Sequence, residues 1–341
     1  MKIENLLTIV IPIKGRHKLA RRLLDNLELQ GCKFQIILSD GSDDNHFEKI
    51  YESNYKSGPL NLKYFWNGKD LSIDHYISKL KKSIEMVHTP FCIFIDDDDF
   101  IDIAGIKYGI KFLYENPDYF CYQNDVQSIM KVDGLFRSQR SLYTKDSIEQ
   151  ENSTDRVLDV IKSFNSFSYA IYKTKEITLF FSILDEAKNN DFQLFMKGWA
   201  YFSALSGKCK REHDASYYYF IPGNSILQNN SQFFKFSQWL GTGDKWEKSL
   251  SFMIAMVEIF DVNPELFAKS FIQEVFEANN IRGVDPDKYY EQFNKIPMSE
   301  KFYDYCSSFT EKLVFDFSLP EEIKNIEKPK RKDFIQWLNT L

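Results

Sequence analysis

Four consecutive aspartates, Asp96–Asp99, are the most distinctive chemical feature of the sequence. They follow a short apolar run, Phe91–Ile95, which is expected to form a buried strand. Neighbouring carboxylates repel one another, so a fold gains no stability from gathering them at the end of a strand. A divalent cation removes this conflict, because Mg²⁺ or Mn²⁺ binds hard oxygen ligands, usually one or two carboxylates together with substrate phosphates.

Backbone geometry suggests which of the four would bind the cation. In an extended segment alternate side chains share a face, so Asp96 and Asp98 are predicted to point together while Asp97 and Asp99 point elsewhere. The alternative is a solvated acidic loop in which Asp99 or Asp102 caps the N-terminus of the next helix. The two interpretations differ in whether the carboxylates face a ligand.

Strands that alternate with helices must position this cluster. Over the first hundred residues the pattern predicts strands at 7–13, 34–38, 60–66 and 91–95, and helices at 17–30 and 71–87. This alternation is typical of a parallel, Rossmann-like sheet whose ligands bind beyond the carboxyl ends of the strands. Three polar clusters follow such strands, so right-handed crossovers should bring them to one edge: Lys14–Arg16, Asp40–Ser42 and Asp96–Asp99.

The sequence pattern beyond the first hundred residues predicts a region of strands and helices, followed by a region of helices. Residues 119–130 and 168–172 are expected to be strands, residues 208–211 and 216–221 two further strands, and helices dominate from about residue 239. We therefore predict an α/β domain over residues 1–235 and a helical C-terminal domain over residues 236–341.

Three of these segments resemble the GT-A glycosyltransferases, in particular glycosyltransferase family 2 and its bacterial relatives that build surface polysaccharides. The segments are TIVIPIKGR at Thr8–Arg16, SDGSDD at Ser39–Asp44 and FIDDDDF at Phe94–Phe100. In order and spacing they are similar to that family's opening strand, nucleotide-binding turn and DxD segment. The resemblance implies a nucleotide-diphospho-sugar transferase fold.

It also implies roles for individual residues near the donor. Asp98 matches the stronger metal ligand, and Asp96 would bind the metal directly or through water. Asp97 would touch the ribose. The nucleotide pocket would be lined by Pro12, Lys14, Arg16 and Asp40, the last of which would contact the base or ribose.

Beyond residue 160 the resemblance concerns the acceptor side. NNDFQLF, around Asp191, is similar to the family's Glu-Asp catalytic-base segment, although Asn190 stands where Glu is usual. Asp191 is therefore the candidate base that deprotonates the acceptor hydroxyl, and the alternative is that it only caps a helix. Phe220 and Pro222 occupy places where the family often has Arg and His, which leaves His213 as the nearest candidate for a third metal ligand.

The implied reaction is transfer of a sugar from a nucleotide-diphosphate donor, with a UDP-sugar favoured, Mn²⁺ or Mg²⁺ as cofactor, and inversion at the anomeric carbon. The implied acceptor is a saccharide or lipid-linked saccharide. Two alternatives remain open. A sugar-nucleotide nucleotidyltransferase would use the same site but usually carries a Gly-rich basic loop, of which KGRHKLARR is a poor version. A non-catalytic module would bind cations and a protein partner.

Composition limits partners and location. The chain has a net charge of −6 and a pI of about 5.6, which argues against a nucleic-acid partner. Five widely spaced cysteines match neither zinc nor disulfide patterns, and a reducing cytoplasm is expected. The basic and apolar tail at residues 327–341 is either a peripheral helix at the inner face of the membrane or a helix packed on the C-terminal domain. The sequence does not decide the oligomeric state, and a homodimer is one of the alternatives.

Overall fold

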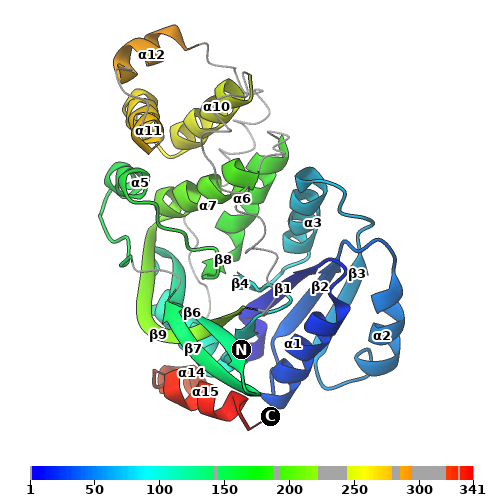
Figure 1. Ribbon diagram of the computed structural model, residues 1–341. Helices are drawn as coiled ribbons and strands as arrows, with labels where there is room; N and C mark the ends of the chain where they lie inside the picture. The colour runs from blue at the N-terminus through cyan, green and yellow to red at the C-terminus, as the bar shows by residue number, and fades with distance from the viewer. Residues whose placement is uncertain are drawn as a thin grey trace.

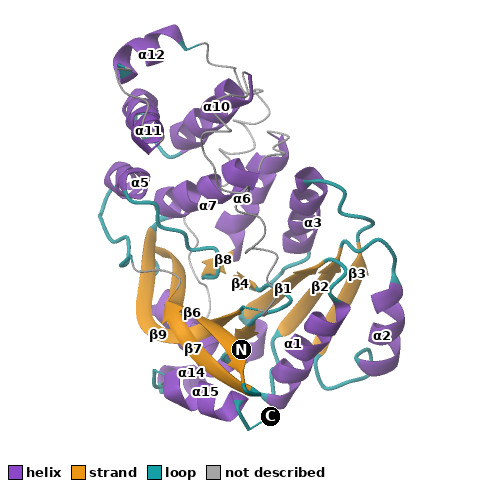
Figure 2. Cartoon of the chain, in the orientation of Figure 1, coloured by secondary structure: helices purple, strands orange, loops and turns teal. Residues whose placement is uncertain are grey.

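The protein is described by a computed structural model that covers residues 2–141, 145–186, 192–221, 244–278, 285–293, 320–328 and 331–340. Over these residues all nine strands belong to one sheet, with the order β3-β2-β1-β4-β8-β6-β9-β5 and β7 paired to β6 (Figure 1). Figure 2 shows the helices surrounding this sheet and extending beyond one end of it.

One half of the sheet is parallel, as the sequence predicts. The strands β1 (Leu7–Ile13), β2 (Gln35–Asp40), β3 (Asn61–Trp66) and β4 (Phe91–Phe94) pair in parallel. Every residue of β1 is buried, as expected for a central strand covered on both faces. The helices that connect these strands are α1 (His17–Leu29), α2 (His46–Asn54) and α3 (Ile73–Glu85).

The other half is mixed. The short strand β8 (Ile171–Lys173) runs antiparallel to both β4 and β6 (Tyr119–Val132). Strand β9 (Lys208–Phe220) runs parallel to β6, and β5 (Phe100–Ile101) pairs antiparallel with β9. A hairpin joins β6 to β7 (Leu135–Ser141), and α4 (Ile103–Glu115) begins just after β5.

The expectation of two strands at 208–211 and 216–221 is wrong, because β9 is continuous. Shifts in its register against β6, around Asn124 and Asp125, absorb the polar residues that suggested a break. Two acidic residues of that stretch are held from outside the sheet. Lys328 pairs with Glu212 at 2.5 Å and with Asp214 at 3.0 Å.

The later helices share a core with the sheet. The helices α5 (Ser153–Lys162), α6 (Thr174–Glu186), α7 (Phe192–Ser206), α10 (Asp244–Ile259) and α11 (Pro264–Ala278) contribute to one hydrophobic cluster with β1, β2 and β4. The short helix α12 (Pro286–Gln292) packs on α11. The proposed division at residue 235 falls outside the described residues and stays a prediction.

The tail returns to the sheet instead of packing on the helical part. After α14 (Glu321–Lys324), helix α15 (Arg331–Leu338) lies against β7 and β9 (Figure 1). The buried Phe334 ring stacks on Tyr218, with 4.5 Å between ring centroids. Within the part of the chain that the structure covers, no helix is both long and apolar enough to span a bilayer.

Candidate functional site

The four aspartates form a turn directly after β4. The backbone N–H of Asp99 donates to the oxygen of Asp96 at 3.2 Å, so the segment is not extended. The expected alternation of side chains between two faces therefore does not hold, because a turn does not alternate its side chains as a strand does. Asp102, and not Asp99, caps helix α4 by accepting from the backbone N–H of Ala104 at 2.9 Å.

Arg16 binds the two middle aspartates. This residue immediately precedes α1, and its guanidinium lies 2.5 Å from Asp97 Oδ1 and 2.7 Å from Asp98 Oδ2. The Asp97 side chain is fully buried, whereas Asp98 keeps 13% of its side chain exposed and Arg16 keeps 46%. A ligand can therefore reach the carboxylate of Asp98 and the guanidinium of Arg16, and Asp96 is half-buried beside them.

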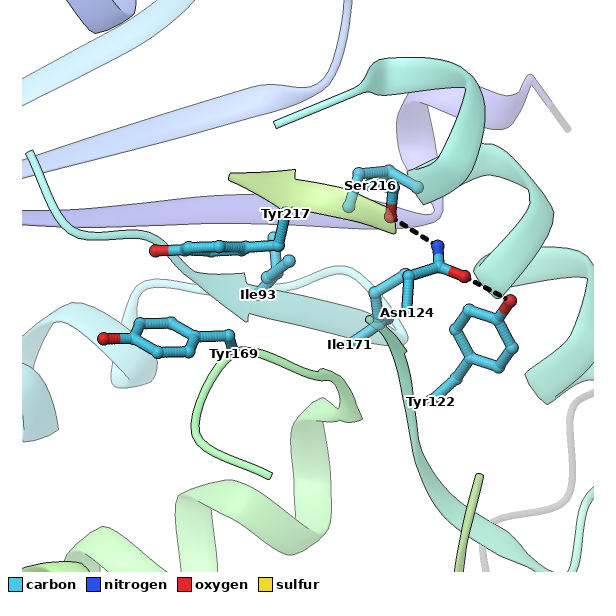
Figure 3. Close-up of a pocket in the computed structure, with 8 residues that line it drawn as sticks. Ile93, Tyr122, Asn124, Tyr169, Ile171, Ser216 and Tyr217 are labelled. Atoms are coloured by element: carbon cyan, nitrogen blue, oxygen red, sulfur yellow. Dashed lines mark hydrogen bonds between the residues drawn. The ribbon is translucent and has the colours of Figure 1, made fainter. Parts of the chain in front are cut away.

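Two tyrosines donate hydrogen bonds to the first and last aspartates of the turn, Asp96 and Asp99. Tyr169 donates to Asp96 Oδ2 at 3.1 Å, and Tyr217 donates to Asp99 Oδ2 at 2.7 Å. Their rings lie with centroids 4.4 Å apart and their hydroxyls point to the same side (Figure 3). Asp99 also accepts from the backbone N–H of Phe220 at 2.9 Å, so this fully buried carboxylate ties the turn to β9.

A small cavity of about 10 Å³ lies beneath these tyrosines, about the space that one water molecule occupies. On its far side Asn124 donates to Ser216 and accepts from Tyr122 at 2.8 Å (Figure 3). Hydrogen bonds among buried side chains fix their orientation, so the support under the aspartates is pre-arranged.

Burial and mutual repulsion control the charge of the aspartates. Burial first, and then the charge of Asp98, raise the pKa of Asp96. Burial raises the pKa of Asp97 to about 7 even though Arg16 opposes the change. Burial and the neighbouring Asp96 and Asp98 place the pKa of Asp99 well above its usual range. These three carboxyl groups therefore keep their protons to higher pH than exposed aspartates do, and a cation bound beside them would favour their ionised forms.

The second polar turn, after β2, lies beside the end of β1. The Gly41 N–H donates to the oxygen of Ile13 at 2.9 Å, and the Gly15 N–H donates to Ser42 Oγ at 2.7 Å. Asp40 is fully buried; it accepts from the Ser42 backbone at 2.8 Å and from Tyr64 at 3.0 Å. In this conformation Asp40 shapes the turn and does not reach solvent.

Pro12 and Lys14, the other residues that the sequence assigns to a nucleotide pocket, lie at the end of β1. Pro12 is buried in the strand opposite Ser39, and Lys14 is exposed and donates to the backbone oxygen of Asp70. The predicted convergence of three polar clusters at one sheet edge thus matches the geometry, since Arg16 reaches the aspartates and Gly15 reaches Ser42.

A buried ion pair under this edge has no counterpart in the predicted site. Lys79 Nζ lies 2.5 Å from Asp70 Oδ2 and donates to the oxygen of Ile13 at 3.0 Å. Only glycine fits at position 41, because a Cβ there would lie 2.0 Å from Asp70 Oδ2. The pair therefore connects α3, the end of β1 and the polar turn. Its one sequence signal is the position of Lys79 on the apolar side of α3, near Ile77, Leu80 and Ile84.

Other predicted residues lie away from the aspartates or outside the described residues. His213 is 74% exposed and faces Asp146 at 3.4 Å. Asp191 and Pro222 lie outside the described residues. Among the residues that the structure does describe, no three His, Cys, Asp or Glu side chains converge to hold a metal ion. Asp96 and Asp98 would supply two carboxylates, so further ligands would have to come from a substrate.

Comparisons with known proteins agree with this architecture. The chain aligns over most of its length with three structures of S. aureus TarS, each with a TM-score of 0.51. A fragment in complex with UDP-GlcNAc is 15% identical, covering 80% of this chain and 73% of that one. The same fragment in complex with UDP is 13% identical, covering 98% and 87%. A longer TarS structure is 15% identical, and only 53% of it is covered.

At these identities the structural matches show a shared fold. No curated protein sequence matches the chain. Residues 8–177, which contain both polar turns, the four aspartates and Tyr169, match the model of glycosyl transferase family 2. The chain belongs to glycosyl transferase family 2 and is a glycosyltransferase with a GT-A fold.

Proposed function

We propose that this glycosyltransferase uses Mn²⁺ or Mg²⁺, bound by Asp98 and Asp96, to transfer a sugar from a UDP-sugar to a saccharide hydroxyl with inversion. The observation that carries the proposal is the reachable carboxylate of Asp98, beside Arg16, at the edge where β1, β2 and β4 end. Ligands of open α/β sheets bind at such an edge.

The donor class is inferred from relatives. Two of the TarS structures that share this fold contain UDP or UDP-GlcNAc. The exposed residues Lys14–Arg16, which follow β1, offer a surface between the aspartates and the buried Asp40–Ser42 turn on which a nucleoside can lie. Trp66 borders this turn, is 46% exposed, and donates to the oxygen of Ser42 at 3.2 Å.

Each group in the site has a defined task in this proposal. Asp96 and Asp98 would hold the cation, which would supply positive charge to offset the charge that develops on the departing diphosphate. Arg16, at 2.7 Å from Asp98, supplies positive charge at the same place. Tyr169 and Tyr217 hold Asp96 and Asp99 in position. The base for the acceptor hydroxyl is Asp191, proposed from the sequence alone.

A thermal-shift assay tests whether the protein binds a nucleotide donor and identifies the nucleobase of that donor. A ligand that binds only the folded state raises the melting temperature, so UDP, GDP, CDP and dTDP are compared with Mn²⁺, Mg²⁺ or EDTA. We expect one nucleotide, UDP, to stabilise the protein in the presence of metal and the shift to vanish in Asp98→Ala. No stabilisation by any pair would contradict a donor site here.

Asp191→Asn tests the catalytic part separately. It should abolish transfer and leave metal-dependent UDP binding intact, because a base acts on the acceptor and not on the donor. Transfer at the unaltered rate in this variant would exclude Asp191 as the base while leaving the donor site standing.

A further inference from the structure

A second recess lies along α1. It is a groove of about 480 Å³ between α1, β5, the β6–β7 hairpin and the end of α15. Figure 1 shows α1, the β6–β7 hairpin and α15 at one end of the molecule, where α1 contacts β5 and α15 contacts β7. None of the residues that line it belongs to the proposed donor site.

The groove is basic in a chain of net charge −6. Four of its lining side chains are cationic, Lys18, Arg21, Arg22 and Lys131, and one, Asp25, is acidic. Asp25 also accepts a hydrogen bond from Tyr55 at 2.8 Å. Lys18 and Lys131 are exposed, and neither forms an ion pair with any residue in the described ranges. This excess of positive charge selects an anion.

Arg22 lies at the bottom of this groove, close to the aspartate turn. Its guanidinium packs 4.5 Å from the ring centroid of Phe100 and 4.3 Å from that of Phe220. It donates to the backbone oxygen of Asp98, while its buried Nε has no hydrogen-bond partner among the described residues. No carboxylate is paired with Arg22 at salt-bridge distance in the described part of the chain.

The groove also has apolar walls. Leu29, Phe100, Phe136 and Leu338 line it, and Leu29 is 63% exposed. Leu135, which precedes Phe136 at the hairpin, is 48% exposed. Lys18 is in the first turn of α1, at the end near the aspartates, and Leu29 is its last residue. At 1.5 Å per residue the two lie roughly 16 Å apart, so the lining changes from basic to apolar along α1, while Phe100 and Phe136 lie against Arg22 and Lys131.

We propose that this groove binds an anionic membrane lipid, with the phosphate at Lys18, Arg21, Arg22 and Lys131 and the first part of the alkyl chain along Leu29. Inorganic phosphate would leave the apolar walls in water, and a neutral lipid would leave Lys18 and Lys131 without an anionic partner. An anionic lipid contacts both kinds of lining, because its phosphate pairs with the basic side chains and its alkyl chain covers the apolar ones. Exposed leucines beside basic side chains are typical of surfaces that rest on a bilayer.

Calorimetric titration with dodecyl phosphate tests the site on the whole protein. We expect dodecyl phosphate to bind, and inorganic phosphate and the uncharged dodecyl maltoside not to bind at the same concentrations. Each lysine near a lipid phosphate contributes about fivefold in affinity, so Lys18→Ala/Lys131→Ala should bind roughly 25-fold more weakly. Lys49→Ala is the matched control, because Lys49 is an exposed lysine on α2 outside the groove.

The same variants separate this proposal from the donor site. Lys18→Ala/Lys131→Ala should keep metal-dependent UDP binding, and Asp98→Ala should keep dodecyl phosphate binding. Co-sedimentation with phosphatidylcholine vesicles should require phosphatidic acid and should weaken in the double variant. Equal binding of inorganic phosphate would make this a free-phosphate site, and an unchanged affinity in the double variant would place any lipid elsewhere. Either result overturns the proposal.

Discussion

Arg16 and the aspartates form a charged cluster whose balance depends on burial. Arg16 is paired to Asp97 and Asp98, yet burial still raises the pKa of Asp97 to about 7. Apart from the contact with Arg16, neither carboxylate oxygen of Asp97 accepts a hydrogen bond within the described residues. A buried carboxylate held by one ion pair is stabilised less than one that also receives hydrogen bonds. Asp97 should therefore impose a measurable pH dependence on stability.

The sign follows from the two protonation states. Between pH 4 and 7 the folded protein holds the Asp97 proton and the unfolded chain does not, so stability falls as pH rises and levels off above 7. Asp97→Asn lacks this titration. Its free energy of unfolding relative to wild type should rise by up to about 1.4 kcal/mol per pH unit in that interval. Urea denaturation of both proteins in EDTA, at several pH values, measures this difference in the free energy of unfolding.

The exposed residue Asp133, at the β6–β7 turn, provides the control. Asp133→Asn should show no comparable slope against wild type. If Asp97→Asn also shows none, Asp97 is ionised in the folded protein at all these pH values, and the compensation by Arg16 is complete.

Single elements position the site, and they differ in how clearly the sequence predicts them. The buried strands β1, β2 and β4 each contain a continuous apolar run, so their existence and parallel direction could be predicted. Helix α2 was missed because it buries one residue, Phe47, and has little apolar periodicity. The polar strand β7, LFRSQRS, was missed for a similar reason.

The candidate site, like the fold, could be predicted from the sequence only in part. The polar clusters that follow parallel strands meet at one edge of the sheet, and the sequence predicts these clusters. The contacts that orient them join residues far apart in sequence, such as Arg16 with Asp98 and Tyr217 with Asp99, and carry no local pattern. Lys79 shows this most clearly, because a lysine on a helix is usually solvated.

Lys79→Met measures what α3 contributes to the sheet edge. The substitution leaves Asp70 buried without its partner, which typically costs about 3–5 kcal/mol of stability. Lys82→Met, an exposed position on the same helix, should change stability by less than about 0.5 kcal/mol. Equal effects of the two substitutions in urea denaturation would show that the Lys79–Asp70 pair does not support the edge.

At the scale of the whole molecule, the sheet and the helices α10 and α11 are parts of one structure. Their apolar residues join a single cluster that includes Val10 of β1, Phe94 of β4 and Phe271 of α11. Helix α15 packs against the opposite part of the sheet through Phe334. Because packed interiors transmit perturbations, we expect this core to unfold as a unit.

Phe271→Ala tests that cooperativity. Phe271 is fully buried, with its ring edge-on to Tyr201 of α7 at 5.8 Å, and its truncation should cost about 3–5 kcal/mol. The variant should melt in one transition at lower temperature by both tryptophan fluorescence and far-UV circular dichroism. Two separated transitions, with the upper one unchanged from wild type, would show that the helical part folds independently of the sheet.

The most direct test of the proposed donor site is a titration of Mn²⁺ followed by electron paramagnetic resonance, in which the signal of free Mn²⁺ falls as the ion binds. Two protein carboxylates need substrate oxygens to complete the ligand set, so Mn²⁺ should bind tightly only when UDP is present. This binding should be lost in Asp98→Ala and kept in Asp159→Ala, an exposed aspartate on α5. Equal Mn²⁺ binding by wild type and Asp98→Ala in the presence of UDP would contradict the metal site proposed for this enzyme.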